Sequence, residues 1–305
     1  MTADDLIQHW GNAKADELAR EFRYVITDMI CRAGGGHLGG ALSLVEIIIS
    51  LYYRIMRVRP ADPRWPERDR LILSKGHAGP VLYAALAYRG FFPKQWLTTL
   101  NQDGTRLPSH VDRNQTPGID MTAGSLGQGL SCACGIALAG KLNRRSYRTF
   151  CIIGDGESDE GQIWEAALFA GQRKLDNLVA ITDYNKLQID GRTEEIISLD
   201  PLAEKWRAFN WEVFEMNGHD WDDVNDTLEK AIEVKGKPAM VIAHTVKGKG
   251  NAAVEGQVAS HYIRVGDKPH KRNTWPRWVI PARCPTREPP CSIMTWRCAS
   301  YTRRP

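Results

Sequence analysis

Two short polar segments, each directly after an apolar run, have the residue types of a site for a divalent cation and a diphosphate. The run 150–153 ends at Gly154-Asp155-Gly156, and a second run, 177–182, ends shortly before Asn185. The segment between the runs has apolar residues at helical spacing, which predicts strand, helix and strand. In a parallel sheet such a unit places Asp155 and Asn185 at the same edge. Their hard oxygen donors, beside glycines that expose backbone, suit Mg²⁺ and a diphosphate.

Each segment also has a plain structural interpretation. Gly154-Asp155-Gly156 alone is an ordinary tight turn, and Asn185 alone is an ordinary capping residue. The diphosphate hypothesis therefore depends on the two segments together, each at the end of a predicted strand.

Two histidines lie in glycine-containing breaks between predicted elements. His37 lies within Gly34–Gly40, where glycines let the backbone approach a ligand closely. His77 follows a short predicted strand, 70–74, and precedes a predicted helix, 81–88, so it too lies at a strand end. For both residues the alternative is a hydrogen-bonded structural histidine.

The rest of the chain alternates helix and strand patterns. Apolar spacing predicts an amphipathic helix over 3–31 and a helix over 44–53 that Ser43 can cap. Further helices are expected at 132–139, 199–210 and 224–235, and further strands at 211–216 and 238–244. This alternation predicts an α/β fold, a doubly wound and mostly parallel sheet with helices on both faces.

Composition indicates a globular protein of a reducing compartment. The 305 residues carry a formal net charge of +4, but residues 265–305 hold nine Lys and Arg against two acids, which leaves about −3 for residues 1–264. The body therefore gives no electrostatic reason to expect a nucleic acid partner. Seven cysteines in no even framework, with no apolar signal segment at the start, predict a cytoplasmic location. The apolar stretch 42–51 is too short to span a membrane.

The chain changes character after residue 264. This change predicts a folded domain over 1–264 and an irregular or disordered tail over 265–305, rich in Pro, Arg and Cys. Zinc binding by Cys284, Cys291 and Cys298, and nucleic acid binding by the basic, aromatic tail, are the alternatives. Cys132 and Cys134 lie two apart on a helix, make a poor metal pair and are expected to be buried.

Taken in chain order, five motifs resemble the amino-terminal half of transketolases, which binds thiamine diphosphate. They are GHLGG (36–40), SKGHAGPVLYAAL (74–86), GSLGQGLS (124–131), GDGESDEGQIWEA (154–166) and DYNKLQIDG (183–191). The resemblance covers about residues 10–261. Two positions depart from the family pattern, because Leu38 replaces a proline and Tyr184 replaces an asparagine that is more often found there.

The resemblance implies a set of ligands for the cofactor and its metal. Mg²⁺, with Ca²⁺ or Mn²⁺ as substitutes, would be coordinated by Asp155, Asn185 and the backbone carbonyl of Leu187. The cofactor-binding residues implied are His77, Gly124, Ser125, Leu126, Asp155, Gly156, Glu157 and Asn185, with Gly124 to Leu126 facing the thiamine.

The same resemblance implies catalytic residues. His37, His77, His110 and His261 would handle the hydroxyl protons of a sugar, although the neighbours of His110 and His261 differ from those usual in the family. His110 lies in a predicted loop, 91–123, and loops often carry chemistry. Glu160 would lie near a subunit interface, linked towards the cofactor-activating carboxylate of the partner. Its alternative is a solvated acid near a helix start.

The implied activity is transfer of a two-carbon ketol unit from a ketose, usually phosphorylated, to an aldose. Thiamine chemistry needs a carboxylate that relays a proton to the aminopyrimidine, and in complete transketolases a second domain of the neighbouring subunit supplies it. From its length, we expect this chain to carry only the diphosphate-binding part and to take that carboxylate from another chain. The expectation is therefore one subunit of a split transketolase, inactive alone, that self-associates and joins a carboxy-terminal subunit in an α2β2 heterotetramer.

Three alternatives stay open at this point. The chain could be a subunit of another thiamine enzyme, similar to deoxyxylulose-phosphate synthase or to a 2-oxo acid dehydrogenase. It could also be a non-catalytic paralogue that binds thiamine diphosphate without turnover. The sequence does not name the sugar, and an unusual donor such as a sulfo- or branched sugar is compatible with it.

Overall fold

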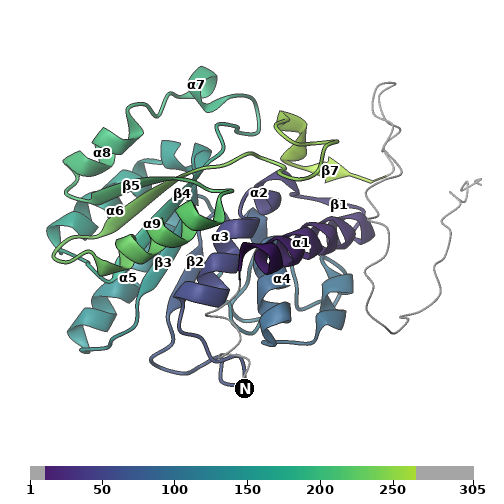
Figure 1. Ribbon diagram of the computed structural model, residues 1–305, viewed down its shortest axis with the longest axis horizontal. Helices are drawn as coiled ribbons and strands as arrows, with labels where there is room; N and C mark the ends of the chain where they lie inside the picture. Colours follow the sequence, from purple (N-terminus) through teal and green to yellow (C-terminus); the bar gives the residue numbers. More distant parts are fainter. Residues whose placement is uncertain (1–10, 266–305) are drawn as a thin grey trace, which may run out of the picture. The chain divides into compact units, whose positions relative to one another are not determined.

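The computed structural model describes residues 11–265, and a five-stranded parallel sheet forms their centre (Figure 1). The strands are β2 (Arg70–Leu73), β3 (Thr149–Gly154), β4 (Leu178–Tyr184), β5 (Glu212–Asn217) and β6 (Ala239–His244). Their spatial order is β2-β3-β4-β6-β5. The chain moves outward as far as β5 and then returns to insert β6 beside β4, which is the reversal of a doubly wound sheet.

Helices cover both faces of this sheet, as the sequence predicts. The longer ones are α1 (Asn12–Arg32), α4 (Gly79–Arg89), α5 (Gln128–Leu142), α6 (Gly161–Gln172) and α9 (Trp221–Glu233). The shorter ones are α2 (Gly39–Leu42), α3 (Val45–Ser50), α7 (Thr193–Ile196) and α8 (Leu202–Ala208), with a π-helical turn, η1 (Leu51–Ile55), after α3. The described residues also form 3₁₀ turns at η2 (Gly76–Ala78), η3 (Lys94–Thr99), η4 (Gly156–Asp159) and η5 (Val258–Ser260).

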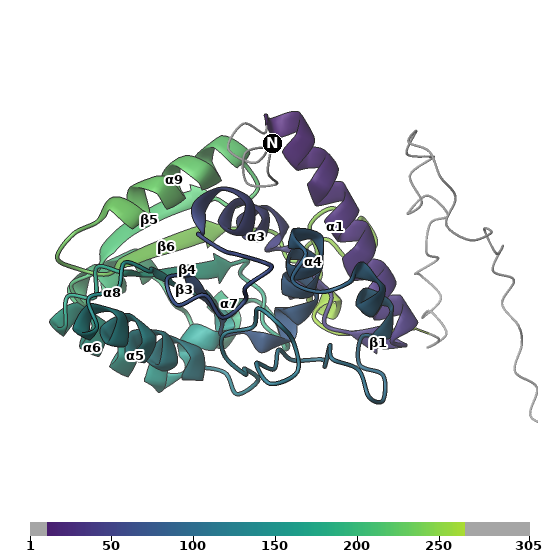
Figure 2. The ribbon, with the colours of Figure 1, turned by 90° about the horizontal axis from the view of Figure 1, so that it is seen from below.

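The two faces of the sheet bury two separate hydrophobic cores. Phe150 and Ile152 of β3 pack in the core that α1, α3, α4 and α9 supply, whereas Cys151 and Ile153 pack in the core of α5, α6 and α8. Figure 2 shows α3 and α9 on one side of the strands and α5 and α6 on the other. Burial on both faces explains why β3 is an unbroken apolar run without polar alternation.

Three local predictions differ from the structure. The helix predicted over 44–53 is divided into α3 and η1, and Ser43 does not cap it, because its hydroxyl donates to Asp183 Oδ2 at 2.6 Å. Cys134 is buried as predicted, but Cys132 is exposed, because the two residues lie on different sides of α5.

A short antiparallel pair joins two distant parts of the chain. Strand β1 (Gly35–Gly36) pairs with β7 (Ile263–Arg264). At Gly35, whose φ is +150°, an added Cβ would lie 2.6 Å from the carbonyl oxygen of Ile263, so the close approach requires glycine. This pair places the loops of His37 and His261 next to each other.

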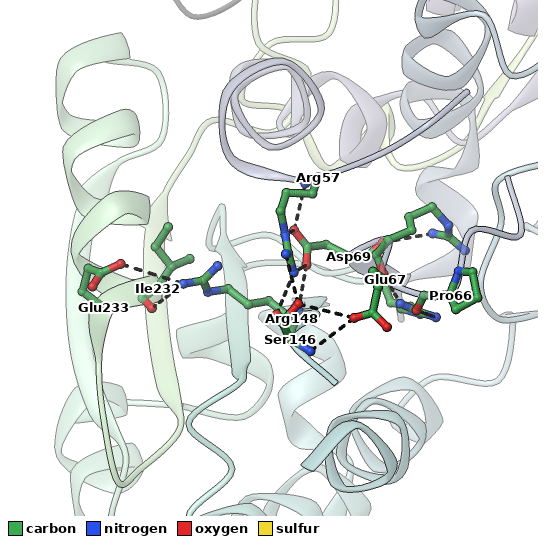
Figure 3. Close-up of polar contacts among 10 residues, drawn as sticks. Arg57, Pro66, Glu67, Asp69, Ser146, Arg148, Ile232 and Glu233 are labelled. Atoms are coloured by element: carbon green, nitrogen blue, oxygen red, sulfur yellow. Dashed lines mark hydrogen bonds and ion pairs between the residues drawn. The ribbon is translucent and has the colours of Figure 1, made fainter. Parts of the chain in front are cut away.

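At the amino-terminal edge of the sheet, the buried carboxylate of Asp69 joins three segments (Figure 3). It accepts hydrogen bonds from the backbone N–H of Arg57 at 2.8 Å and of Arg148 at 2.7 Å, and it pairs with the Arg57 guanidinium at 3.0 Å. Arg148 extends the contact to the end of α9 through the carbonyl of Ile232 and the carboxylate of Glu233.

We expect Asp69→Asn to destabilise the protein by about 1–3 kcal/mol, because an amide cannot accept all the hydrogen bonds that this buried carboxylate accepts. Urea unfolding measures the change. A loss below about 0.5 kcal/mol would show that the three segments are held together without Asp69.

Some predictions fall outside the described residues. The tail cysteines Cys284, Cys291 and Cys298, and all of the tail after Val265, are among them, as is the start of the helix predicted from residue 3. Within residues 11–265 no helix is both long enough and apolar enough to cross a membrane.

Candidate cofactor and active site

A cavity of about 290 Å³ opens at the carboxyl edge of the sheet, where β2, β3 and β4 end. The strand register explains this position, since Gly154 of β3 pairs with Asp183 of β4, so that Asp155 and Asn185 follow at adjacent strand ends. Residues from many segments line the cavity. They include His37, Gly40, Lys75, His77, His110, Gly124, Leu126, Gly154, Asp155, Gly156, Glu157, Asn185, Leu187, Lys247 and His261.

The four predicted histidines converge in this cavity. The ring centroid of His37 lies 5.1 Å from that of His77, 5.4 Å from that of His110 and 5.4 Å from that of His261. His77 and His261 are also 5.1 Å apart. His37 Nδ1 is buried and has no hydrogen-bond partner within the described residues, so it is available to an oxygen of a bound molecule.

All four imidazoles are neutral at pH 7. Burial, the proximity of the His110 imidazole and the charge of Lys247 lower the pKa of His37 to about 4, and burial with the charge of Lys247 lowers that of His261 to about 3. Burial also lowers the pKa of His110, and it lowers the pKa of His77 well below its usual range. Neutral imidazoles both donate and accept a proton, as hydroxyl chemistry requires.

These lowered pKa values predict loss of stability in acid. A histidine whose pKa is depressed on folding contributes stability above its unfolded pKa of about 6.5, and that contribution is lost as the pH falls through the folded values. Unfolding free energies measured by urea at pH 7.5, 6, 5 and 4 should fall steadily below pH 6.5. His37→Gln should flatten this dependence, and an unchanged slope in that variant would contradict a neutral, buried His37.

The predicted metal ligands lie together. Asp155 Oδ1 accepts from the Gly156 N–H at 2.8 Å and Oδ2 from the Lys186 N–H at 2.5 Å. The side-chain oxygen of Asn185 accepts from the Leu187 N–H at 3.1 Å, and Leu187 lines the same cavity. Burial and the charge of Asp183 raise the pKa of Asp155 to about 7.

Sequence reasoning missed the residue at the centre of this edge, Asp183. Its buried carboxylate pairs with Lys75 and accepts hydrogen bonds from the hydroxyls of Ser43 and Thr245 and from the amide of Asn185. Burial opposes ionisation, but the charge of Lys75 and these hydrogen bonds outweigh it and lower the pKa of Asp183. Two features of the sequence could have indicated Asp183: it is an acid at the end of an apolar strand, and the SKGHAG motif contains a lysine, Lys75, that follows another strand of the same sheet.

Lys247 is a second cation that sequence reasoning did not single out. Its side chain is buried, and Nζ donates to the carbonyl of Leu187 at 2.7 Å. Burial and the charge of Lys75 lower the pKa of Lys247 to about 8. Two ammonium groups therefore face one cavity beside a carboxylate and an amide.

Glu157 fixes the loops around the cavity. Its Oε1 accepts from the Ser74 hydroxyl and from the Gly127 N–H at 2.9 Å, and Oε2 accepts from the Gly154 N–H at 3.0 Å. Its carboxylate thus joins the ends of β2 and β3 to the turn before α5. The structure gives Glu157 this bracing contact in addition to its place in the cavity wall.

Not every predicted residue lines the cavity. Gly124 and Leu126 do, whereas Ser125 between them is exposed and is absent from the wall. Glu160 is also exposed, directly before α6, and its Cβ lies 2.8 Å from where a Cβ of Gly127 would be. Because Gly127 has a φ of +83°, this contact requires glycine there. Glu160 therefore borders the GSLGQG turn from the outer surface.

The donor set of the cavity is of mixed type. No group of three or more His, Cys, Asp and Glu side chains in the described part of the chain is arranged to hold a metal ion. The candidate donors are instead one carboxylate, one amide and one backbone carbonyl, oxygen ligands of the kind that Mg²⁺ prefers.

Comparison with known proteins identifies the family. The family description "Transketolase, thiamine diphosphate binding domain" matches residues 14–274. The chain is 54% identical over 250 residues to 6-deoxy-6-sulfo-D-fructose transketolase subunit SqwG of Clostridium sp. (strain MSTE9), covering 82% of this chain and 91% of that protein. It is 43% identical over 262 residues to an apulose-4-phosphate transketolase subunit of Actinobacillus succinogenes, covering 84% and 95%.

Solved structures agree with this result. The crystal structure of transketolase from Campylobacter jejuni matches with a TM-score of 0.79 and 33% sequence identity, over 83% of this chain. The chain spans only 40% of the length of that protein. The α/β fold predicted from the sequence is confirmed. The chain belongs to the transketolase family, and it carries the amino-terminal domain that binds thiamine diphosphate.

Proposed function

We propose that the chain is the cofactor-binding subunit of a split transketolase that transfers a two-carbon ketol unit from a ketose to an aldose. The observation that carries this proposal is the cavity itself, in which four neutral imidazoles lie beside the Asp155–Asn185 pair and two buried lysines. The lysines suit anion binding, the Asp155–Asn185 pair suits metal binding, and the imidazoles suit proton transfer at sugar hydroxyls.

The residues present fit a diphosphate with Mg²⁺. Asp155, Asn185 and the Leu187 carbonyl would hold the metal, and Lys75 and Lys247 would offset the negative charge of the diphosphate. The contact between Lys247 Nζ and the Leu187 carbonyl supports the assignment, because that carbonyl already attracts a cation. Gly40 lies against Lys75, since a Cβ added there would be 3.2 Å from its Nζ.

Thiamine diphosphate, when bound, supplies the nucleophilic carbon that cleavage of a ketose C–C bond needs. The histidines would do the proton work. His37, whose Nδ1 has no hydrogen-bond partner among residues 11–265, is placed to accept or donate a proton at a substrate hydroxyl, and His77, His110 and His261 surround the same position. A neutral imidazole can accept a proton at one ring nitrogen while it donates one from the other, so that no net charge stays buried on the ring.

The relatives suggest which donor to test first. The SqwG subunit is named for 6-deoxy-6-sulfo-D-fructose, and the relatives at 42–43% identity are named for apulose 4-phosphate. We propose an anionic ketose as donor, with 6-deoxy-6-sulfo-D-fructose tested before apulose 4-phosphate and xylulose 5-phosphate, because the identity to SqwG is higher.

A partner subunit is the second part of the proposal. The relatives named above are called subunits. In addition, Ile189 borders the cavity with 62% of its surface exposed, and Ile196 and Ile197 nearby in the chain are 44% and 55% exposed. Exposed apolar side chains in the segment that follows the cavity wall suit a surface that another protein covers. The carboxylate that activates the aminopyrimidine would come from that partner.

Ketol transfer with ribose 5-phosphate as acceptor tests the proposal. The chain is assayed alone and with the product of a neighbouring transketolase-like reading frame, with thiamine diphosphate and Mg²⁺. Activity in the mixture only is the expected result. Cofactor binding without turnover for any of the three donors would favour a non-catalytic role, and activity of the chain alone would contradict the need for a partner.

A further inference from the structure

A buried charged network lies behind the segment Val246–Lys249, outside the wall of the cavity. It consists of Arg23 on α1, Glu46 on α3 and His219 in the turn between β5 and α9. The side chains of these residues are only 16%, 7% and 10% exposed, respectively. Helix α3 packs against both α1 and α9, and Figure 1 shows α3 between them.

The hydrogen bonds of His219 fix its tautomer. Its Nε2 is 2.8 Å from the backbone nitrogen of Val246, which can only donate, so Nε2 is the unprotonated acceptor. Its Nδ1 therefore carries the proton and donates to Glu46 Oε2 at 3.1 Å. His219 thus connects the carboxylate of Glu46 to the first residue of the segment.

The Arg23 side of the network reaches the other end of the segment, at Lys249. Arg23 Nη2 pairs with Glu46 Oε1 at 2.5 Å, and Arg23 Nε donates to the carbonyl of Lys249 at 2.9 Å. Gly250 packs on this guanidinium, because a Cβ added there would lie 2.6 Å from Arg23 Nε. One carboxylate, Glu46, therefore holds both the first and the last residue of Val246–Lys249.

Between these two anchors lies Lys247. The Gly248 N–H donates to the carbonyl of Gly39 at 3.0 Å, which ties the segment to the His37 loop. Thr245, the residue before the segment, bonds Asp183. The backbone on both sides of Lys247 is therefore fixed, and its side chain lies in the cavity wall with Nζ on the Leu187 carbonyl.

We infer that Arg23, Glu46 and His219 are positioning residues that aim Lys247 at the bound diphosphate. The inference rests on the proposed cofactor site. None of the three lines the cavity, so they act only through the backbone of Val246–Lys249. Burial alone would raise the pKa of Glu46, but the hydrogen bond from His219 and the charge of Arg23 outweigh it and lower that pKa. The carboxylate is thus ionised and holds both Arg23 and His219 at neutral pH.

A double-mutant cycle tests this inference. Binding of Mg²⁺ with inorganic diphosphate to the full chain is measured by calorimetry for the wild type, Lys247→Met, His219→Ala and the double variant. His219→Ala should weaken binding about tenfold, the range typical of residues that orient a ligand-binding group. Lys247→Met should weaken binding at least as much. The double variant should bind no more weakly than Lys247→Met, because His219 has nothing left to position.

Asp69→Asn is the matched control. It disturbs a buried carboxylate with guanidinium and backbone partners at the opposite edge of the sheet, so it should lower stability without changing diphosphate affinity. All variants are measured at a temperature where circular dichroism shows them folded.

The possible failures are distinguishable. If the wild type does not bind diphosphate, or Lys247→Met binds as well as it does, the proposed cofactor site is wrong. If Lys247→Met weakens binding but His219→Ala does not, or the two effects add, the positioning role is wrong. Weaker binding in Asp69→Asn, equal to that in His219→Ala, would show a general effect of stability and would also overturn the inference.

Discussion

Asp155→Asn is expected to abolish ketol transfer by the assembled enzyme and to weaken Mg²⁺–thiamine diphosphate binding by more than about 100-fold, beyond the loss typical of residues one shell further out. Asp155 is the one carboxylate among the three candidate metal donors, and its neighbours Asn185 and the Leu187 carbonyl are uncharged. Calorimetry of the assembled pair and an activity assay measure the two losses.

The same variant should behave differently without metal. Because burial and the charge of Asp183 raise the pKa of Asp155 to about 7, this carboxyl stabilises the metal-free protein at low pH, and that contribution is lost as the pH rises through about 7. Asp155→Asn should therefore gain stability relative to the wild type from pH 6 to pH 8, and Mg²⁺ affinity of the wild type should fall below pH 7. Equal pH dependence in both proteins would contradict the raised pKa.

The second large effect is expected at Asp183. Asp183→Asn leaves the ammonium of Lys75, 2% exposed, without its ionic partner, and breaking a buried pair from one side costs about 3–5 kcal/mol. Urea unfolding measures this loss. The variant also disturbs Ser43 and Thr245, which bond the same carboxylate.

Lys75→Met combined with Asp183→Asn separates the two roles of the pair. The double variant removes the unpaired charge, so most of the lost stability should return, while diphosphate binding should stay weak because one cation is gone. If the double variant is as unstable as Asp183→Asn alone, the hydroxyl contacts rather than the ion pair carry the stability.

The sequence predicted the elements that have strong periodicity and the residues that belong to motifs. Strand β3 is an apolar run that stops at the turn Gly154-Asp155-Gly156, so the positions of the strand and the turn could be predicted from the sequence. The grouping of His37, His77 and His110 in one site was implied by the resemblance to transketolases, and of the three only His77 was also predicted from the pattern to follow a strand. The strand ends depend on local pattern and on the rule that parallel strand ends share an edge.

The features that were missed depend on contacts distant in sequence. Ser43 has the residue type and position of a helix cap. Its hydroxyl instead donates to Asp183, 140 residues away, because the fold places that carboxylate next to Ser43. Lys75 and Lys247 look like solvated lysines until burial places them at the cavity. Arg23 and Glu46 follow helical spacing, and nothing local in the sequence indicates that His219 completes their network.

Pairing of β1 with β7 has a consequence for how the site is made during synthesis. The partners Gly36 and Ile263 are more than two hundred residues apart, so the loop of His37 stays unanchored until nearly the whole domain has left the ribosome. Such long-range pairing forms late, because its loop-closure entropy is offset only once the intervening chain is compact. We therefore expect the His37 loop to be anchored late: a nascent chain stopped before residue 263 holds all five strands of the parallel sheet but lacks the β1–β7 pair that brings the loops of His37 and His261 together.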